Sequence, residues 1–193
     1  PPRSTLFPYT TLFRSPQNTK WMKGYIIGDP RFKKIGTSTH KIIYTWAKKE
    51  FKNLLELRRN GIRVPEPITC LDNILIMEFI GDDFGSPATR LKDLDEIENP
   101  AELLERLLLD IREMYLNAHL VHGDLSEYNI LHWNGERIII DVSQAVSIFH
   151  NESIVYLERD IRNVISFFSQ FIEDDLLNPE EIIQQILQEY KNR

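Results

Sequence analysis

Hydrophobic residues recur at helical spacing in four stretches of this chain, and polar or glycine-containing stretches separate them. This spacing predicts four amphipathic helices. We expect them from about residue 44 to 60, from residue 100 past 115, from about 154 to 172, and from 179 to the C-terminal end. Their predicted buried sides carry Trp46, Phe51, Leu54, Leu55 and Leu57 in the first helix, Leu103, Leu104, Leu107, Leu108, Ile111, Met114 and Tyr115 in the second, Leu157, Ile161, Val164, Ile165, Phe168 and Phe171 in the third, and Ile182, Ile183, Ile186, Leu187 and Tyr190 in the last.

Boundary residues support three of these helices. Asn99-Pro100 and Asn178-Pro179 each combine an asparagine, whose side chain can cap a helix, with a proline at the first helical position. Gly61 suits the position just after a helix end. The asparagines are therefore expected to cap their helices through their side chains.

Other patterns predict strands and irregular segments. Residues 73–80 are almost continuously apolar and predict a buried strand. Residues 21–39 and 142–152 have no clear periodicity and predict irregular connections. Residues 81–87, which are rich in glycine and aspartate, predict a flexible crossing and the best boundary between two lobes.

A hairpin is predicted around Asn134-Gly135, because this dipeptide takes the positive φ angles of a type I′ turn and lies between two short apolar runs. If Trp133 pairs with Glu136, counting back along both strands places Asn129 opposite Ile140. Asp141 is then its next neighbour, and Asp124 lies on the loop that leads into the first strand. Two carboxylates and one amide oxygen are therefore expected to converge at the open end of the hairpin.

Such an oxygen cluster suits Mg²⁺, which proteins usually hold with one or two carboxylates together with substrate phosphates. Protein kinases place a catalytic Asp on a loop, an Asn five residues later on one metal ion, and a second Asp after the next strand. Asp124, Asn129 and Asp141 match that order and spacing. The alternative is a polar turn beside a hairpin, since Asp and Asn favour loops, but it requires three coincidences.

Composition limits the class of protein. The chain has 193 residues, of which 42% are hydrophobic and 27% charged, and its formal net charge is -6. It can bury a real core, and its acidic balance gives no general footprint for nucleic acid or an anionic membrane. Cys70 is the only cysteine, so no intrachain disulfide can form, and no apolar run approaches the roughly 18 residues of a membrane span. We therefore expect a cytoplasmic protein.

The first residues form a near-palindrome around Pro8-Tyr9-Thr10, with neither helical nor strand periodicity. They lack the features of a secretory signal. We interpret residues 1–16 as an artefactual tail, such as translated adapter DNA, or as a short natural tail without chemistry. Residues 1–16 are therefore left out of the expected fold.

With these motifs in view, the chain from about Lys20 to the last helix resembles the RIO family of atypical serine protein kinases, and within it the first branch. The most specific stretches are Leu125-Ser-Glu-Tyr-Asn129 and Ile140-Asp-Val-Ser-Gln144. The others are Gly28-Asp-Pro-Arg-Phe32, Thr45-Trp-Ala-Lys-Lys-Glu-Phe51, Val64-Pro-Glu-Pro67, Met77-Glu-Phe-Ile-Gly81, His122-Gly-Asp124 and Arg159-Asp-Ile-Arg-Asn163.

The resemblance implies an α+β, protein-kinase-like two-lobed fold, with residues 17–80 as an incomplete N-terminal lobe and 81–193 as a mainly helical C-terminal lobe. It implies ATP and Mg²⁺ as cofactors, a protein substrate or autophosphorylation, and a precursor of the small ribosomal subunit as partner. Carried over by position, Asp124 is the catalytic base, Asn129 and Asp141 are the metal ligands, and Asp141 can also accept phosphate. The backbone of Glu78 and Ile80 would hold adenine.

Three further residues have implied roles and open alternatives. Glu50 would pair with the nucleotide lysine, or would be a solvated surface residue. Asp160 would hold the catalytic loop from the following helix, or would be an exposed helical residue. His122 is expected to orient the loop through packing and hydrogen bonds.

The sequence also departs from the family pattern. None of its eight glycines forms a Gly-rich phosphate loop, and no lysine ahead of Glu50 ends an apolar strand. These groups hold phosphates, so we expect a truncated kinase with weak nucleotide binding, little turnover and exposed apolar surface around residues 73–80. A small-molecule phosphotransferase of kinase-like fold and a non-catalytic ribosome-assembly module remain alternatives.

Overall fold

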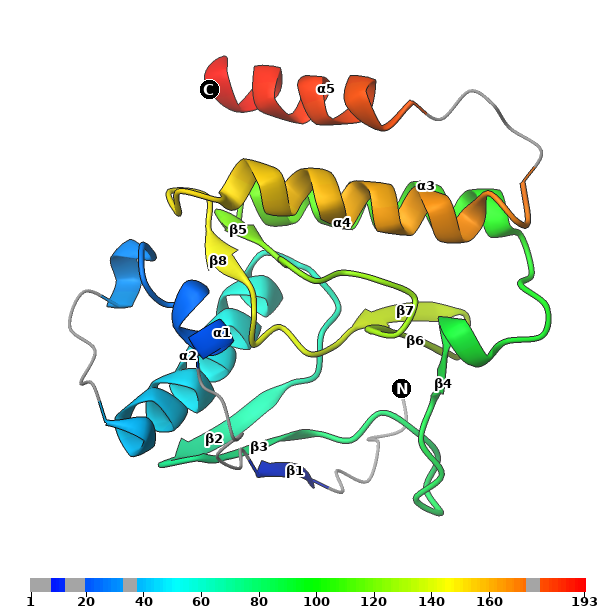
Figure 1. The fold of residues 1–193 in the computed structure, drawn as a ribbon. Coiled ribbons are helices and arrows are strands. Elements are labelled where there is room, and N and C mark those ends of the chain that lie inside the picture. Colours follow the sequence, from blue (N-terminus) through cyan, green and yellow to red (C-terminus); the bar gives the residue numbers. More distant parts are fainter. Residues whose placement is uncertain (1–7, 13–19, 33–37, 173–177) are drawn as a thin grey trace.

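The computed structural model describes residues 8–12, 20–32, 38–172 and 178–193 (Figure 1). A small antiparallel sheet lies at one end of the molecule and helices lie at the other. The sheet has the strand order β1-β3-β2, with β1 at Pro8–Leu12, β2 at Pro67–Leu71 and β3 at Ile74–Glu78. Helix α2, Thr39–Arg59, packs against β2 and β3.

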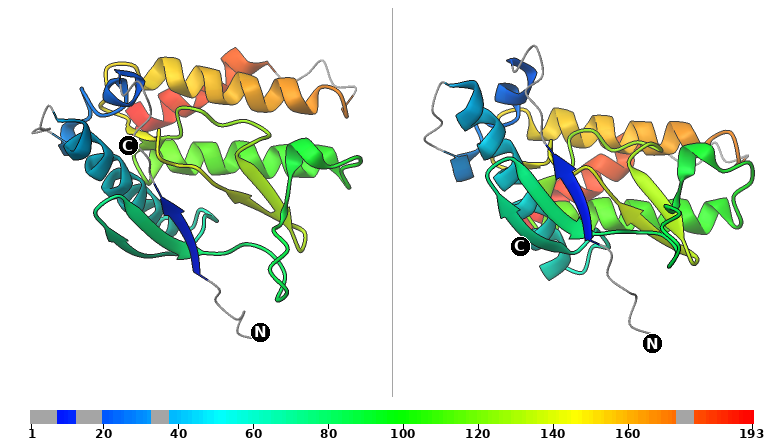
Figure 2. Two further views of the ribbon diagram at one scale, coloured as in Figure 1. Left: turned by 60° about the horizontal axis from the view of Figure 1, so that its bottom comes forward. Right: turned by 90° about the horizontal axis from the view of Figure 1, so that it is seen from below.

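The helical part consists of α3 (Pro100–Leu116), α4 (Ser153–Phe168) and α5 (Pro179–Lys191), which pack against one another. Between these helices and the small sheet lies the hairpin of β6 (Ile130–Trp133) and β7 (Glu136–Ile139), to which β4 (Thr89–Arg90) adds a third strand. Seen from below, the small sheet and this hairpin lie in front of the helices (Figure 2). The arrangement confirms the expected α+β fold with a small sheet lobe and a helical part.

Short elements complete the chain. Helix α1 is Lys20–Gly24, and the 3-10 helices η1 and η2 are Pro30–Phe32 and Leu91–Asp93. Strands β5 (Leu120–Val121) and β8 (Val146–Ser147) form a separate antiparallel pair. The segments expected to be irregular thus contain α1, η1 and β8. None of the described helices is long and apolar enough to span a membrane.

One hydrophobic core joins the two parts of the molecule. Leu54 and Leu57 of α2 and Leu75 of β3 belong to the same buried cluster as Leu107 of α3 and Ile161 of α4. The apolar stripes that predicted the helices are the surfaces that meet in this cluster. The core is therefore continuous across residues 80 and 81, where the sequence predicted a boundary between lobes.

The four predicted helices are confirmed, and their ends differ. Helix α2 begins at Thr39 rather than near Tyr44, because Ser38 Oγ accepts a hydrogen bond from the Lys41 amide (3.4 Å) and caps the helix earlier. Helix α4 ends at Phe168 rather than Ile172. On the predicted buried sides, Phe51, Leu55, Leu108, Ile165, Phe171, Ile182, Leu187 and Tyr190 are only half-buried.

The expected side-chain caps have different outcomes. Asn178 Oδ1 accepts a hydrogen bond from the Glu180 amide (3.0 Å), so the cap of α5 is confirmed. The cap of α3 is wrong in its mechanism, because Asn99 takes a left-handed conformation (φ 51°) and its side chain makes no cap bond. Its carbonyl accepts from the Leu103 amide (3.1 Å) instead.

The strand predicted for residues 73–80 is shorter and less buried than expected. Strand β3 covers Ile74–Glu78, and within it only Leu75 is buried. Its lower burial follows from its position, because Met77 and Glu78 line a cavity. Residues 81–87, expected to be a flexible crossing, form a tight turn in which Asp82 Oδ1 accepts from the amides of Phe84 (2.9 Å) and Ser86 (2.8 Å).

A second difference concerns the N-terminal tail. No strand periodicity was expected there, yet residues 8–12 form β1, which pairs with the edge of β3. The rest of the tail, residues 1–7 and 13–16, lies outside the described residues, and its artefactual origin stays a prediction. Because β1 covers one edge of β3, the backbone of that strand is paired on both sides.

Candidate active site

The hairpin places the predicted polar residues together, as the sequence indicated. Asn134 and Gly135 have φ angles of 52° and 75°, and Trp133 pairs with Glu136. At the open end, the Ile140 amide donates to the Asn129 carbonyl (2.9 Å). The predicted type I′ turn and register are therefore confirmed, and Asp141 follows directly after the residue that pairs with Asn129.

Hydrogen bonds fix the side chains of this cluster. Asn129 Nδ2 donates to the Asp124 carbonyl (2.7 Å), and Gln144 Nε2 donates to Asp124 Oδ2 (2.6 Å). Ser143 Oγ donates to Asp141 Oδ1 (2.7 Å). Gln144 and Ser143 thus connect the segment after Asp141 to both carboxylates.

The donor set suits a hard divalent cation. Because Asn129 Nδ2 faces a carbonyl, the amide oxygen of the same side chain remains for a ligand, and Asp141 is exposed and keeps its second oxygen. In the described part of the chain, no three or more His, Cys, Asp or Glu side chains form a metal cluster. This incomplete cage is what Mg²⁺ uses when substrate phosphates supply further ligands.

Helix α4 holds the loop that carries Asp124. Asp160 is 1% exposed, and its carboxylate accepts from the amides of Gly123 and Leu125, both at 2.8 Å. On the same helix, Arg159 donates to the Gly123 carbonyl and Asn163 Nδ2 donates to the Leu125 carbonyl (3.1 Å). The predicted role of Asp160 is confirmed, and the exposed alternative is wrong.

Burial raises the pKa of Asp160 to about 6, although His122, the two amides and Arg159 oppose this shift. His122 itself is buried and its Nε2 lies 3.2 Å from the Ile140 carbonyl. It therefore connects the loop of Asp124 with the strand end that precedes Asp141. The expected orienting role of His122 agrees with this contact.

A cavity of about 720 Å³ extends from this site between the small sheet and the hairpin. Its walls are mostly apolar, and Glu50 and Asp141 supply carboxylates to its lining. The lining residues are Glu50, Leu54, Pro65, Met77, Glu78, Phe79, Ile80, Pro87, Ala88, Thr89, Arg90, Asp93, Leu131, Ile140 and Asp141. An apolar cavity with a few convergent polar groups is typical of a small-molecule site.

Both residues predicted to hold adenine line this cavity. The Ile80 carbonyl accepts from the Ala88 amide (2.9 Å), and no described residue accepts a hydrogen bond from the Ile80 amide. The Glu78 amide donates to the Glu66 carbonyl (2.8 Å), and Arg63 contacts both oxygens of the Glu78 carboxylate at 2.8 Å. Burial raises the pKa of Glu78, but the hydrogen bonds from Arg63 and from the Glu66 amide, together with the charges of Arg63 and Arg58, lower the pKa overall. The amide and the carboxylate of Glu78 are thus both engaged within the protein.

Glu50 is buried, with 3% of its surface exposed, so the solvated alternative is wrong. No basic side chain in the described ranges forms an ion pair with it. Burial, and then the negative charge of Asp141, raise its pKa to about 8, while Lys49 opposes the shift. At neutral pH the Glu50 carboxyl is therefore mostly protonated in the nucleotide-free chain.

We expect Glu50→Gln to flatten the dependence of stability on pH between pH 6 and 8. The folded pKa lies above the ordinary value of 4.5, so the contribution of Glu50 to the free energy of unfolding falls as pH rises from about 4.5 to 8. One such group changes stability by up to about 1.4 kcal/mol per pH unit, or about 2 kcal/mol from pH 6 to 8, because the slope decreases near the folded pKa. Urea unfolding followed by circular dichroism at several pH values measures this difference.

The exposed Glu105→Gln is the matched control and should reproduce the slope of the parent. If stability depended on pH in the Glu50→Gln variant as it does in the parent, Glu50 would have the same pKa in the folded chain as in water.

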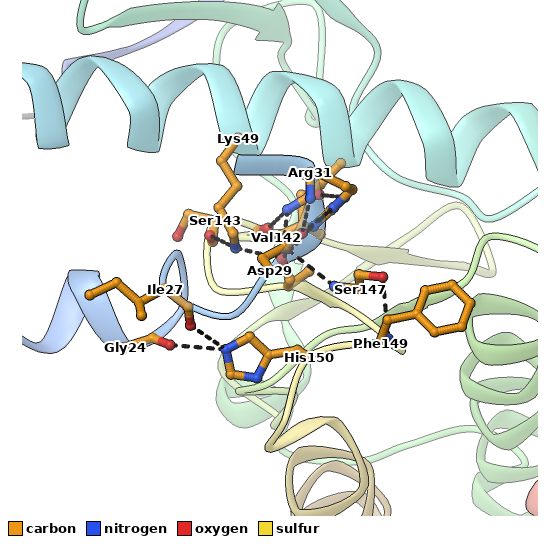
Figure 3. Close-up of polar contacts among 12 residues, drawn as sticks. Gly24, Ile27, Asp29, Arg31, Lys49, Val142, Ser143, Ser147, Phe149 and His150 are labelled. Atoms are coloured by element: carbon orange, nitrogen blue, oxygen red, sulfur yellow. Dashed lines mark hydrogen bonds and ion pairs between the residues drawn. The ribbon is translucent and has the colours of Figure 1, made fainter. Parts of the chain in front are cut away.

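Sequence reasoning missed a buried polar group that holds the segment after Asp141, and Figure 3 shows Lys49 of this group. Lys49 and Asn53 are both 0% exposed, and their side chains donate to backbone carbonyls of residues 142–145. Both residues lie at helical spacing from Trp46, on the buried side of α2. That spacing was the available signal, but polar residues are usually assigned to a solvated face.

His150 was also given no role from the sequence. Its Nε2 donates to the carbonyls of Gly24 (3.1 Å) and Ile27 (2.9 Å), and its Nδ1 accepts from the Glu152 amide (3.1 Å) (Figure 3). His150 is buried and in this arrangement carries its proton on Nε2. It fastens the segment after α1 to the segment that follows β8.

Comparison with known proteins gives consistent matches. Residues 12–182 match the model of the RIO domain. A RIO-type serine/threonine-protein kinase Rio1 of Haloferax volcanii is 43% identical over 149 residues, which cover 76% of this chain and 50% of that protein. Rio1 of Thermoplasma acidophilum is 39% identical over 166 residues, covering 86% of this chain and 84% of the relative.

The human serine/threonine-protein kinase RIO1 is 41% identical over 150 residues, covering 77% of this chain and 25% of the human protein. The chain thus spans half or less of the length of several relatives. Among solved structures, the Rio2 kinase of Chaetomium thermophilum in a complex with ADP, Mg²⁺ and phosphoaspartate matches with a TM-score of 0.62 and 25% identity. That match covers 74% of this chain and 44% of the Rio2 chain.

Proposed function

Because this chain belongs to the RIO family, we propose that it binds ATP and Mg²⁺ and transfers the γ-phosphoryl group, as a serine/threonine protein kinase or an ATPase. The observation that carries the proposal is the joint placement of Asp124, Asn129 and Asp141. They lie at the open end of one hairpin, and Asp141 lines the apolar cavity. Family membership disfavours the small-molecule phosphotransferase.

In this proposal each polar residue has one task. Asn129 and Asp141 hold Mg²⁺ through side-chain oxygens, and the ion when bound neutralises charge on the phosphates. Asp124 accepts the proton of the attacking hydroxyl group. Gln144 orients the Asp124 carboxylate by donating to Oδ2 and leaves Oδ1 for that proton.

The cavity supplies a place for the base and sugar of the nucleotide. Met77, Leu131 and Ile140 provide apolar walls for a planar ring. The Ile80 amide and the Glu78 carbonyl are the groups that can pair with the edge of adenine. The position of both residues in the cavity lining supports this assignment.

Asp141 is also a candidate phosphate acceptor, as the phosphoaspartate in the Rio2 complex suggests. A carboxylate oxygen of Asp141 would form a bond to the γ-phosphorus while the bond to the oxygen of ADP breaks. Attack of water on the acyl phosphate would then release inorganic phosphate and restore the carboxylate. The exposure of Asp141 is consistent with water reaching it.

Several finer expectations belong to the same proposal. The sequence has no Gly-rich phosphate loop and no strand lysine ahead of Glu50, so we expect weak nucleotide binding by the chain as given. A cytoplasmic location, a division into lobes at residues 80 and 81, and a partner in the precursor of the small ribosomal subunit are inferred from sequence and resemblance.

Calorimetry with ATP tests the proposal, with and without Mg²⁺. We expect Mg²⁺ to strengthen binding to the parent chain, and Asp141→Ala to weaken Mg²⁺-dependent binding by about 10- to 100-fold, because a charge-assisted contact is lost. The exposed Asp95→Ala should bind like the parent. If the parent binds ATP equally in the presence and absence of Mg²⁺, the proposed metal site is wrong.

A non-catalytic assembly module is the second candidate. It predicts that binding to a small-subunit precursor particle survives in the double variant with Asp124→Ala and Asp141→Ala, without nucleotide. Sedimentation with purified particles measures this. Binding that requires ATP and both carboxylates would favour the kinase or ATPase.

A further inference from the structure

We propose that Arg31, Lys49 and Asn53 form a loop clamp that positions Asp141, by holding the backbone of residues 142–145 from the side of α2. These three residues are positioning residues and do not reach the cavity. The proposal rests on the proposed function only where it assigns Asp141 to Mg²⁺. Figure 3 shows the side chains of Arg31 and Lys49 beside the backbone of Val142 and Ser143.

The loop clamp binds three carbonyls within four residues. Lys49 Nζ donates to the carbonyls of Ser143 (2.7 Å) and Ala145 (2.5 Å). Asn53 Nδ2 donates to the carbonyls of Val142 (2.8 Å) and Ala145 (3.0 Å). Two side chains one helical turn apart therefore fix the path of the chain directly after Asp141.

Arg31 closes the loop clamp from the opposite direction. Its guanidinium donates to Asn53 Oδ1 (2.8 Å) and to the Ala145 carbonyl (3.4 Å). Asp29 holds the same guanidinium through Nε (2.9 Å) and a second nitrogen (2.6 Å), and also accepts from the Ser147 amide (3.2 Å). Asn53 is thereby oriented, since its oxygen faces Arg31 and its nitrogen faces the loop.

The burial of these groups argues against a role in solubility or surface charge. Lys49 and Asn53 are both 0% exposed. Burial, and then the positive charge of Arg31, lower the pKa of Lys49 well below its ordinary value. Burying an amine that contacts backbone carbonyls rather than a carboxylate costs free energy. An apolar residue would avoid this cost, but it could not donate hydrogen bonds to the loop.

Asp141 needs such support because its own conformation is unfavourable. Its φ is 55°, a left-handed conformation that costs energy for any residue with a side chain. The residue is exposed, and among the described residues its side chain accepts one hydrogen bond, from Ser143 of the loop. On the C-terminal side of Asp141 the backbone is held by the loop clamp, since the next carbonyls are those that Lys49 and Asn53 hold.

Two neighbouring residues of α2 contact different parts of the site. Glu50, the neighbour of Lys49, lines the cavity, while Lys49 holds the loop. A small displacement of α2 would change both the cavity wall and the geometry of Asp141. Helix α2 therefore contacts both the cavity and the loop next to the proposed metal site.

Hydrogen exchange on the nucleotide-free chain tests the loop clamp directly. We compare Lys49→Met, which keeps the length of the side chain and removes its donors, with the exposed neighbour Lys48→Met. Lys49→Met should speed exchange of the amides of residues 142–147 by about tenfold or more, because two hydrogen bonds that hold the loop are lost. Exchange in the hairpin β6–β7 and in α3 should match the control.

The metal dependence of nucleotide binding provides the second readout. For Lys49→Met, the Mg²⁺ concentration needed for half-maximal strengthening of ATP binding should rise by about tenfold, while ATP binding in EDTA stays as in Lys48→Met. If Lys49 only stabilised the fold, Lys49→Met would lower the melting temperature and leave the half-maximal Mg²⁺ concentration unchanged. Asn53→Leu repeats both measurements if Lys49→Met does not fold.

The outcomes separate the loop clamp from the proposed function. Exchange in residues 142–147 that matches the control, or that rises uniformly over the whole chain, overturns the loop clamp. If the parent shows no effect of Mg²⁺ on ATP binding, the proposed metal site fails, but the exchange data on the nucleotide-free chain still decide the loop clamp.

Discussion

Replacing Asp124 by asparagine should lower the rate of phosphoryl transfer by about 10²- to 10⁴-fold, the usual contribution of a general base. Asparagine has nearly the same shape, and its amide oxygen can still accept the hydrogen bond from Gln144. The substitution removes the negative charge and, with it, the ability to take a proton. ATP binding should therefore change by no more than about twofold, which corresponds to a few tenths of a kcal/mol.

Single-turnover transfer from radiolabelled ATP, to the chain itself or to water, measures this rate. The exposed Asp95→Asn is the control for loss of one negative charge. Equal rates in the Asp124→Asn variant and the parent would exclude Asp124 as the base. If Asp141 accepts phosphate directly, the substitution should slow hydrolysis of the acyl phosphate more than its formation, because only hydrolysis requires removal of a proton from water.

The second large effect is expected in folding rather than in chemistry. Asp160→Ala should reduce the free energy of unfolding by about 3 kcal/mol at pH 7, because two buried amides lose the carboxylate that accepts their hydrogen bonds and each costs about 1–3 kcal/mol when unpaired. These amides belong to Gly123 and Leu125, on either side of Asp124. Part of the loss is offset, because the buried carboxylate is itself costly and its pKa is raised to about 6.

Two variants resolve these contributions in urea unfolding. Asp160→Asn keeps one acceptor oxygen and should lose less stability than Asp160→Ala. Glu158→Ala, on the same helix and less buried, should be nearly neutral. The raised pKa of Asp160 also predicts a pH dependence: relative to Asp160→Ala, the parent should lose stability as pH rises from about 4 to about 6. A parent that gains stability over this range relative to Asp160→Ala would contradict the raised pKa.

The hairpin and its polar end could be predicted because local rules fix them. The turn at Asn134-Gly135 sets the register, and the register places Asn129 and Asp141 at one end without any knowledge of distant contacts. The helices follow from apolar spacing for the same reason. Asp160 was found through resemblance, and its two contacts with the loop of Asp124 agree with that assignment.

The remaining features depend on contacts that are distant in sequence. Lys49 donates to carbonyls 94 and 96 residues away, and a carbonyl has no signature in the sequence. The burial of Glu50 depends on how α2 packs against the rest of the fold. Asn99 matched the local rule for a cap, and the structure uses its backbone instead. Strand β1 forms by pairing with the edge of β3, which does not require alternating side chains.

The continuous core restricts the relative movement of the two parts of the molecule. Leu54 and Leu75 on the sheet side share one buried cluster with Leu107 and Ile161 on the helical side. A rigid rotation of one half against the other would have to separate these side chains and expose apolar surface to water, at about 25 cal/mol for each Å². Under the proposed function, ADP would therefore leave by local movement of the cavity wall around Pro87 to Arg90 rather than by a swing of whole lobes.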